Sequence, residues 1–377
     1  MSLPRSWHRL AWRAALSNVK RLSFPYKLTF AVTDRCNARC EICRVWRREP
    51  RPELTAGEIS RFFARSNGFS WIDLTGGEVV LREDLPEIVA GILAACRGLS
   101  ILHFPTNGQL PDRTVDVAER ILALRPPSLI VTVSLDGPPE VHDSLRGIPG
   151  AYDRALETFV RLRALAGARV FLGMTVSALN APLLRETAAS VAARVPGFST
   201  RELHLNLVQF SDHGYGNLDE RGRATLSPAA GPWAEALRLA PARGPKDLLQ
   251  RAYLRRIPEY LATGRMSVPC QALAATCFMD PSGVVHPCSM HGRPLGSVRE
   301  SGWDLGRIWD APAAVRARRD LTEGRCPGCW SPCEAYPGIL GSALRCLVPW
   351  PPATGPSAGG APGRRMPGVT EGGRGSA

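Results

Sequence analysis

The sequence predicts an α/β fold: a partial TIM-like barrel of six βα units, followed by a small cysteine-rich C-terminal subdomain. Short β-branched or apolar runs alternate with longer amphipathic segments between residues 26 and 207. Six such units are too few for a closed eight-fold barrel. Seven of the eleven cysteines lie between Cys270 and Cys346, which predicts the subdomain. A chain of 377 residues with 44% hydrophobic content is long enough for a barrel with an appendage.

The first 25 residues predict a basic amphipathic helix, because apolar residues such as Trp7 and Leu10 alternate with arginines. We expect this helix to pack over one end of the barrel. The alternative is a peripheral contact of residues 1–22 with a membrane surface or a lipid substrate.

The barrel is predicted over 26–210, with strands at 26–32, 71–74, 101–106, 129–134, 170–176 and 202–207. A helix over 55–65 begins with a capping box at Thr55 and Glu58, and another over 151–165 stops before Gly167. A bridging segment follows over 211–269, with one or two helices near 248–261. The cysteine-rich subdomain takes 270–348, and the Pro- and Gly-rich tail 349–377 is expected to be disordered.

The formal charge of +13 raises the question of a polyanionic partner. The excess is almost entirely arginine, scattered among Ala, Pro and Gly, so it indicates a compositional bias rather than a nucleic-acid-binding stripe. The chain has no long uncharged apolar run and no signal-peptide pattern, so we expect a cytoplasmic protein. Thiols stay reduced in that compartment, and clustered cysteines therefore point to metal.

Three cysteines follow the first predicted strand: Cys36, Cys40 and Cys43. A loop with this spacing can wrap one iron-sulfur cube, and such clusters usually take four thiolates. A triad without a fourth ligand leaves one iron open to a small molecule. A zinc knuckle is the alternative, but zinc takes four protein ligands in structural sites, and no histidine stands within twenty residues.

This triad resembles that of the radical S-adenosylmethionine (SAM) superfamily, whose open iron is chelated by the amino and carboxylate groups of SAM. The resemblance extends to Thr75–Glu78, where the family carries Gly-Gly-Glu-Pro and this chain has Val79 in place of the proline. It also covers the ends of the third and fourth strands. It implies that the two glycines let the backbone approach the methionine end of SAM and that Glu78 accepts a hydrogen bond from the ammonium of SAM. It also implies that Ser134 contacts the ribose or carboxylate of SAM, that Asp136 shapes its own loop and that Arg146 binds a carboxylate. The implied cofactor-binding residues are Gly76, Gly77, Glu78, Asn107, Ser134, Asp136 and Arg146.

The C-terminal cysteines resemble the SPASM and Twitch extensions of radical SAM enzymes, which carry auxiliary [4Fe-4S] clusters. The full SPASM spacing is not met. We expect one auxiliary cluster, with Cys277 or Cys333 as a substitute ligand; a second cluster that uses Cys333 and Cys346, or a structural zinc site, are the alternatives. The expected ligands are Cys270, Cys288, Cys326 and Cys329, in a segment where 283–288 predicts a hairpin that ends in a ligand.

The resemblance implies an enzyme that reductively cleaves SAM to a 5′-deoxyadenosyl radical, which abstracts hydrogen from a substrate carbon. An electron donor such as flavodoxin or ferredoxin is implied as a partner. We expect a net oxidation or epimerisation of a small molecule, sugar or lipid, because only about 25 residues precede the first strand, too few for the precursor-binding domain of many peptide-modifying relatives. The alternatives are a peptide maturase and, in another class, a non-catalytic protein that binds zinc and nucleic acid.

Overall fold

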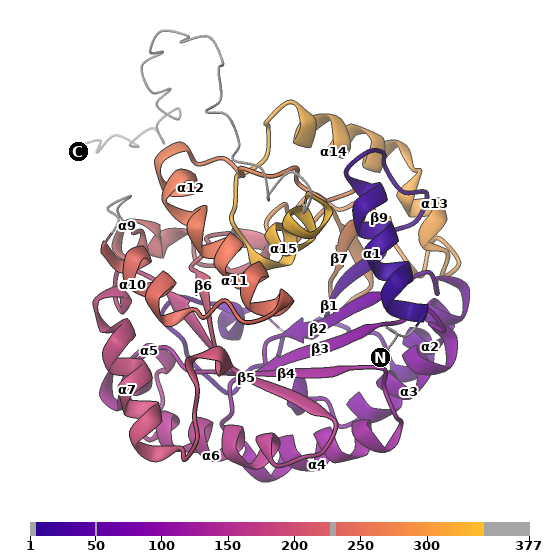
Figure 1. Ribbon diagram of the computed structural model, residues 1–377. Coiled ribbons are helices and arrows are strands. Elements are labelled where there is room, and N and C mark those ends of the chain that lie inside the picture. Colours follow the sequence, from indigo (N-terminus) through magenta and orange to yellow (C-terminus); the bar gives the residue numbers. More distant parts are fainter. Residues whose placement is uncertain (1–4, 50, 227–230, 343–377) are drawn as a thin grey trace, which may run out of the picture.

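The computed structural model describes residues 5–49, 51–226 and 231–342. Six parallel strands lie side by side in chain order and form the wall of an open barrel (Figure 1). Their bounds are β1 Lys27–Thr33, β2 Trp71–Gly76, β3 Ile101–Thr106, β4 Leu129–Ser134, β5 Ala168–Val176 and β6 Leu203–Leu207. The sheet does not close on itself, so the predicted partial barrel is confirmed.

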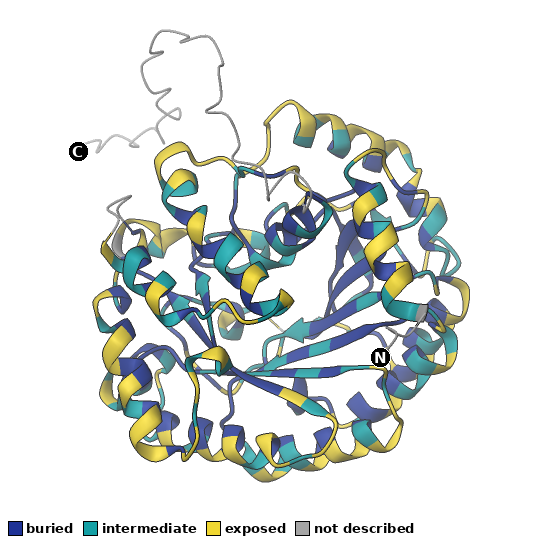
Figure 2. Ribbon diagram, in the orientation of Figure 1, coloured by how far each residue is buried: buried dark blue, intermediate teal, exposed yellow. Residues whose placement is uncertain are grey.

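Helices cover the outer face of this wall. Alternate strand residues such as Leu28, Phe30 and Val131 pack against them in one continuous core, and Figure 2 shows the buried side of each helix turned toward the strands. The predicted capping box at Thr55 and Glu58 is confirmed. The covering helices are α2 Ala56–Arg65, α3 Leu85–Ala95, α4 Pro111–Ala123, α5 Pro139–Arg146, α6 Ala151–Arg163 and α7 Leu184–Arg194.

Helix α1 (Arg5–Ser17) lies over the amino-terminal ends of the strands. Leu10 and Ala14 are buried against Tyr26 and Ile101, which begin or precede strands. The expectation that this helix packs over one end of the barrel is therefore confirmed. Trp12 on the same helix is 67% exposed. A membrane contact stays a prediction, and no helix among the described residues has the length and apolarity needed to cross a bilayer.

The chain after the barrel adds three more strands to the same sheet. β7 (Thr276–Met279) pairs with β1 in parallel, and β8 (Val284–His286) and β9 (Gly296–Ser297) continue antiparallel, so the predicted hairpin is present. The sheet runs across the predicted boundary between 269 and 270; the division into domains stays a prediction. The remaining helices are α8 Asp212–Tyr215, α9 Arg221–Ala224, α10 Gly231–Leu239, α11 Pro245–Arg255, α12 Ile257–Thr263, α13 Leu305–Trp309, α14 Pro312–Thr322 and α15 Pro332–Gly341.

Helix α11 lies against β6 at one edge of the sheet, and α15 packs against α11. The Gln250 side chain donates to Leu205 O at 2.8 Å, and the Tyr253 hydroxyl accepts from Leu207 N at 3.0 Å, so side chains satisfy backbone groups of the last barrel strand. The same hydroxyl donates to Trp330 O at 3.0 Å. This edge of the sheet is thereby tied to the C-terminal cysteine segment. Cys346 and the tail 349–377 lie outside the described residues.

Candidate active site

The three N-terminal cysteines lie on one loop at the carboxyl end of β1. Its backbone is held by the last turn of α5: Arg39 N donates to Arg146 O at 3.0 Å, and Glu41 N donates to Leu145 O at 2.9 Å. Cys40 is buried, whereas Cys36 and Cys43 are partly buried. The loop is therefore pinned on the face of the barrel where enzymes of this architecture place their chemistry.

Two nitrogen donors from other parts of the barrel reach the sulfurs. Arg146 Nη1 lies 3.7 Å from Cys40 Sγ, and Asn107 Nδ2 lies 4.0 Å from Cys36 Sγ. Burial raises the pKa of Cys36 to about 12 and that of Cys43 to about 11. Without a ligand, these two thiols are thus protonated at neutral pH, and a metal centre is what would hold them as thiolates.

No group of three or more His, Cys, Asp or Glu side chains converges on a single ion site in the part of the chain that the structure describes. A four-iron cube takes one thiolate at each liganded corner, so its ligands need not meet at one point. The triad on this loop fits such a group: the thiols share one pinned segment and have hydrogen-bond donors beside them.

Gly76 and Gly77 let the end of β2 lie directly against the cysteine loop. A Cβ atom on Gly76, which has φ 141°, would lie 2.0 Å from Thr33 O, and one on Gly77 would lie 2.2 Å from Arg35 O. Gly77 N donates to that same Thr33 O at 2.8 Å. This backbone contact was not predicted from the sequence. The predicted approach of these glycines to SAM stays a prediction.

Glu78 is buried and joins the β2 loop to the β3 loop. Its carboxylate accepts from Asn107 N at 2.6 Å and from Val80 N at 3.4 Å. Burial raises the pKa of Glu78 to about 7, against the opposing effect of these hydrogen bonds. The Asn107 side chain in turn donates to Asn37 Oδ1 at 2.7 Å, within the cysteine loop. Asn37 was not predicted as a site residue from the sequence, in which its position next to Cys36 is the one sign of this role.

Asp136 and Arg146 form a buried ion pair at 2.6 Å. Burial would lower the pKa of Arg146, but Asp136, Cys40 and Cys43 together outweigh it and the net shift is upward. Asp136 also accepts from Thr175 N at 2.8 Å, so each partner has several contacts within the protein. Ser134 lies at the end of β4, opposite Gly173. The structure thus brings the predicted residues at the ends of β2, β3 and β4, together with Arg146 of α5, to one end of the barrel, while their contacts with SAM stay predictions.

Comparison with known proteins agrees with this geometry. Residues 30–177, which carry the cysteine loop and the polar strand ends, match the radical SAM superfamily. Residues 30–177 therefore form a radical SAM domain. This domain implies a catalytic [4Fe-4S] cluster and SAM, as expected from the sequence. The non-catalytic zinc and nucleic-acid alternative is therefore set aside.

The matches between this radical SAM enzyme and individual relatives extend beyond the barrel. AdoMet-dependent heme synthase of Methanosarcina barkeri is 27% identical, over 84% of this chain and 90% of the relative. The sporulation killing factor maturation protein SkfB of Bacillus subtilis is 24% identical, over 75% of this chain and 65% of the relative. The crystal structure of Streptococcus suis SuiB bound to S-adenosylmethionine shares the fold, with TM-score 0.54 and 16% identity, over 82% of this chain and 71% of SuiB.

Two C-terminal cysteines of the radical SAM enzyme lie together, Cys288 after β8 and Cys329 before α15. Cys288 and Cys329 are buried in one small cluster with Ala272 and Met290. Burial, Glu334 and the neighbouring Cys329 and Cys270 raise the pKa of Cys288. Thiols that oppose one another's ionisation in this way fit a shared cation.

The other C-terminal cysteines differ in their surroundings. Cys270 and Cys326 are exposed, and Cys333 is partly buried at the start of α15. Cys277 lies on β7 within the main apolar core, outside the small cluster that holds Cys288 and Cys329. The structure thus brings Cys288 and Cys329 together directly, and which cysteines bind an auxiliary cluster stays a prediction.

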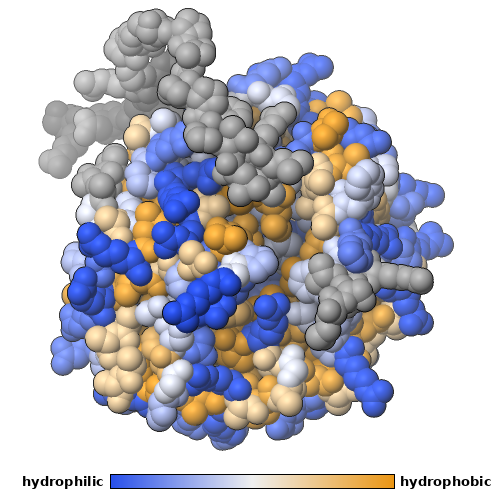
Figure 3. All heavy atoms as spheres, in the orientation of Figure 1, coloured by the Kyte–Doolittle hydropathy of each residue, from blue (hydrophilic) through white to orange (hydrophobic). Residues whose placement is uncertain are grey.

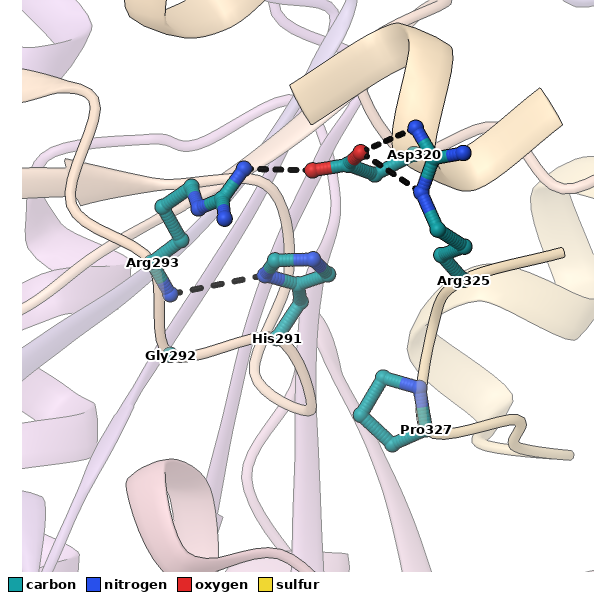
Figure 4. Close-up of a pocket in the computed structure, with 6 residues that line it drawn as sticks. All are labelled: His291, Gly292, Arg293, Asp320, Arg325 and Pro327. Atoms are coloured by element: carbon teal, nitrogen blue, oxygen red, sulfur yellow. Dashed lines mark hydrogen bonds and ion pairs between the residues drawn. The ribbon is translucent and has the colours of Figure 1, made fainter. Parts of the chain in front are cut away.

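A surface pocket of about 450 Å³ is lined by residues of the loop after Cys288, by α14 and by the residues on both sides of Cys326 (Figure 4). Its acidic side chain, Asp320 on α14, pairs with Arg293 and, at 2.7 Å, with Arg325. Arg293 lies on the loop after Cys288, and Arg325 directly precedes Cys326, so Asp320 ties both loops to α14.

On the face of the molecule shown in Figure 3, hydrophilic side chains are interspersed with apolar ones. No single hydrophilic stripe runs across that face.

Proposed function

We propose that this radical SAM enzyme carries out a net oxidation or epimerisation of a small molecule, with Cys36, Cys40 and Cys43 as the ligands of the catalytic cluster. The observation that supports the assignment is the pinned triad with Arg146 at Cys40 and Asn107 at Cys36. The match to a heme synthase over most of both chains favours a small-molecule substrate.

When bound, the catalytic cluster supplies the electron that cleaves SAM to a 5′-deoxyadenosyl radical. The protein's own residues hold the cysteine loop in position and shield the reaction from water. Arg146 places a positive charge beside the anionic sulfurs, and Asp136 holds that guanidinium in position. Glu78 and Asn107 fix the β2 and β3 loops on one side of the triad. The surrounding burial keeps water and stray thiols away from the reacting carbon.

Cys270, Cys288, Cys326 and Cys329 would hold one auxiliary [4Fe-4S] cluster, with Cys333 as the replacement for one of them. Such a cluster supplies an acceptor for the electron that a net oxidation releases. The clustering of Cys288 with Cys329 supports this set. An electron donor such as flavodoxin or ferredoxin would reduce the enzyme.

Peptide maturation is the second candidate. The match to SkfB, a maturation protein, covers 75% of this chain and supports it. The two candidates differ in what stimulates SAM cleavage. We expect a small-molecule fraction of cell extract, rather than a peptide fraction, to increase 5′-deoxyadenosine formation; stimulation by peptides alone would favour maturation.

The central test is anaerobic reconstitution followed by reduction in the presence of SAM. Two clusters predict about eight irons per chain, and the reduced protein should form 5′-deoxyadenosine. Alanine at Cys36, Cys40 and Cys43 together should abolish the product and remove about four irons. Cys96→Ala is the matched control, because Cys96 is a buried cysteine outside both groups. Product formation by the triple variant would disprove the assignment.

A further inference from the structure

The segment 209–217, which follows β6 and contains α8, contacts both groups of cysteines. Its most buried side chain is Asn217, which is fully inaccessible. Asn217 Nδ2 donates to Ile42 O at 2.7 Å and to Gln209 O at 2.9 Å, and its Oδ1 accepts from Ser211 N at 3.0 Å. Ile42 directly precedes Cys43, so this amide holds the catalytic cysteine loop.

Two further contacts hold the same side. Arg44 N, directly after Cys43, donates to Tyr215 O at 2.7 Å. The Arg48 guanidinium donates to Asp212 O at 3.3 Å. The residues on both flanks of Cys43 are therefore bonded to the segment.

The opposite side of the segment holds the C-terminal cysteines. Ser211 Oγ donates to Ser289 O at 3.2 Å, and Ser289 follows Cys288. Gln209 Oε1 accepts from Trp330 N at 2.9 Å, and Trp330 follows Cys329. The segment is thus bonded to the residue after each of the two buried C-terminal cysteines.

The fit of the segment between the two groups leaves little room. A Cβ atom on Gly214 would lie 2.3 Å from Ser289 O. The Tyr215 ring packs against the cluster that contains Cys288 and Cys329, while its backbone oxygen binds Arg44. If one cysteine group moves, it therefore pushes against backbone atoms that hold the other group in place.

We propose that residues 209–217 form a connector that fixes the two cysteine groups relative to one another, with Asn217 as its positioning residue, so that a change at one iron-sulfur site alters the other. This inference rests on the proposed function, because it takes both groups as cluster ligands. Asn217 acts through the backbone of the cysteine loop and touches neither sulfur nor substrate in this role.

The test compares Asn217→Ala with Asn180→Ala. Asn180 is equally buried and makes a matching set of bonds, to Asp136 O, Thr175 O and Ser177 N, but it supports only the β4 and β5 loops. Both proteins are reconstituted with iron and reduced, and the electron paramagnetic resonance spectrum is recorded. Asn217→Ala should change the signals of both clusters, whereas Asn180→Ala should leave the auxiliary signal unchanged.

A double-mutant cycle measures the coupling itself. We expect Cys326→Ala with Cys329→Ala to shift the midpoint potential of the catalytic cluster and to weaken SAM binding about fivefold in the wild-type background. Both effects should disappear when Asn217→Ala is present. Additive effects, or a change confined to the catalytic signal in Asn217→Ala, would overturn the connector.

Tyr215→Leu keeps the measurement decisive if Asn217→Ala fails to fold. It removes the ring contact with the C-terminal cluster and leaves the bonds of Asn217 intact, so the auxiliary signal should change and the cycle should lose part of its coupling. Failure of the proposed function is recognised separately: wild-type protein would then take up no iron or cleave no SAM. If the wild type takes up iron and cleaves SAM but the effects in the double-mutant cycle are additive, the connector alone is disproved.

Discussion

The two cysteine groups of this protein are built in opposite ways. The catalytic triad lies on a single loop, and the barrel presses the ends of α5, β2 and β3 against it. The C-terminal group is gathered from separate stretches: the residues before β7, the end of β8 and the segment before α15. A local motif can be recognised from spacing, whereas a group assembled by tertiary structure depends on the folded position of every stretch.

Their electrostatic surroundings differ as well. Arg146 stands beside the catalytic sulfurs. At the C-terminal group, burial and the negative charge of Glu334 together raise the pKa values of Cys288 and Cys329, although a backbone hydrogen bond partly offsets this at Cys329. We therefore expect the C-terminal group to depend more strongly on metal for its ordered structure.

Single cysteine substitutions should show the largest difference in function between the two regions. Cys40→Ala should abolish 5′-deoxyadenosine formation, because the catalytic cluster loses a ligand. Cys329→Ala should keep SAM cleavage and lose substrate turnover. Chromatographic assay of both products checks this. Loss of SAM cleavage in Cys329→Ala, with the catalytic iron retained, would erase the functional difference.

Removing the cation beside the triad should have the next largest effect. Arg146→Met leaves Asp136 as a buried carboxylate without its partner, and breaking such a pair costs about 3–5 kcal/mol. Denaturant unfolding of the metal-free protein measures the loss. Arg146→Met with Asp136→Leu is the control, since removal of both charges should restore much of the stability.

Each region also contains one buried carboxyl group whose pKa lies near neutrality. Burial raises the pKa values of Glu78 and Glu334 from 4.5 to about 7. The folded state therefore binds the proton more tightly than the unfolded state, and this stabilisation is lost as pH rises from 4.5 through 7. Relative to Glu78→Gln or Glu334→Gln, wild type should lose about 3 kcal/mol of unfolding free energy across that range. A pH-independent difference in denaturant unfolding would contradict this.

A smaller effect is expected from Gly77→Ala. The added Cβ would collide with Arg35 O in the cysteine loop, and overpacking of this kind costs about 1–3 kcal/mol. Gly57→Ala is the matched control, because a Cβ atom there meets nothing within 4 Å and alanine favours the helix. Iron content should fall in the first variant and stay at the wild-type level in the second.

The smallest effect should come from Asp320→Asn beside the C-terminal cysteines. Its partners Arg293 and Arg325 are about half exposed, and surface ion pairs contribute little to stability. We expect unchanged iron content and a thermal midpoint close to that of wild type. A large loss of iron would show that this surface clamp organises the C-terminal group.

Much of the barrel could be predicted from the sequence. Strands β3 and β4 have the predicted bounds, and β1, β2, β5 and β6 differ from prediction by one or two residues at their ends. Periodicity and turn residues act locally, so they carry this information along the chain. The addition of β7 to the sheet beside β1 was not predicted, because pairing between Lys27 and Thr276 depends on contacts far apart in sequence.

The triad, its place after the first strand and the polar residues at the strand ends were all predictable from the sequence, because spacing and strand order act over short distances. The contacts of Gly76 and Gly77 with the cysteine loop, the approach of Arg146 to Cys40 and the position of residues 209–217 between the two cysteine groups became evident from the folded structure alone. These contacts join segments with no shared local pattern. They form only when the packed core brings separate strand ends and loops to one end of the barrel.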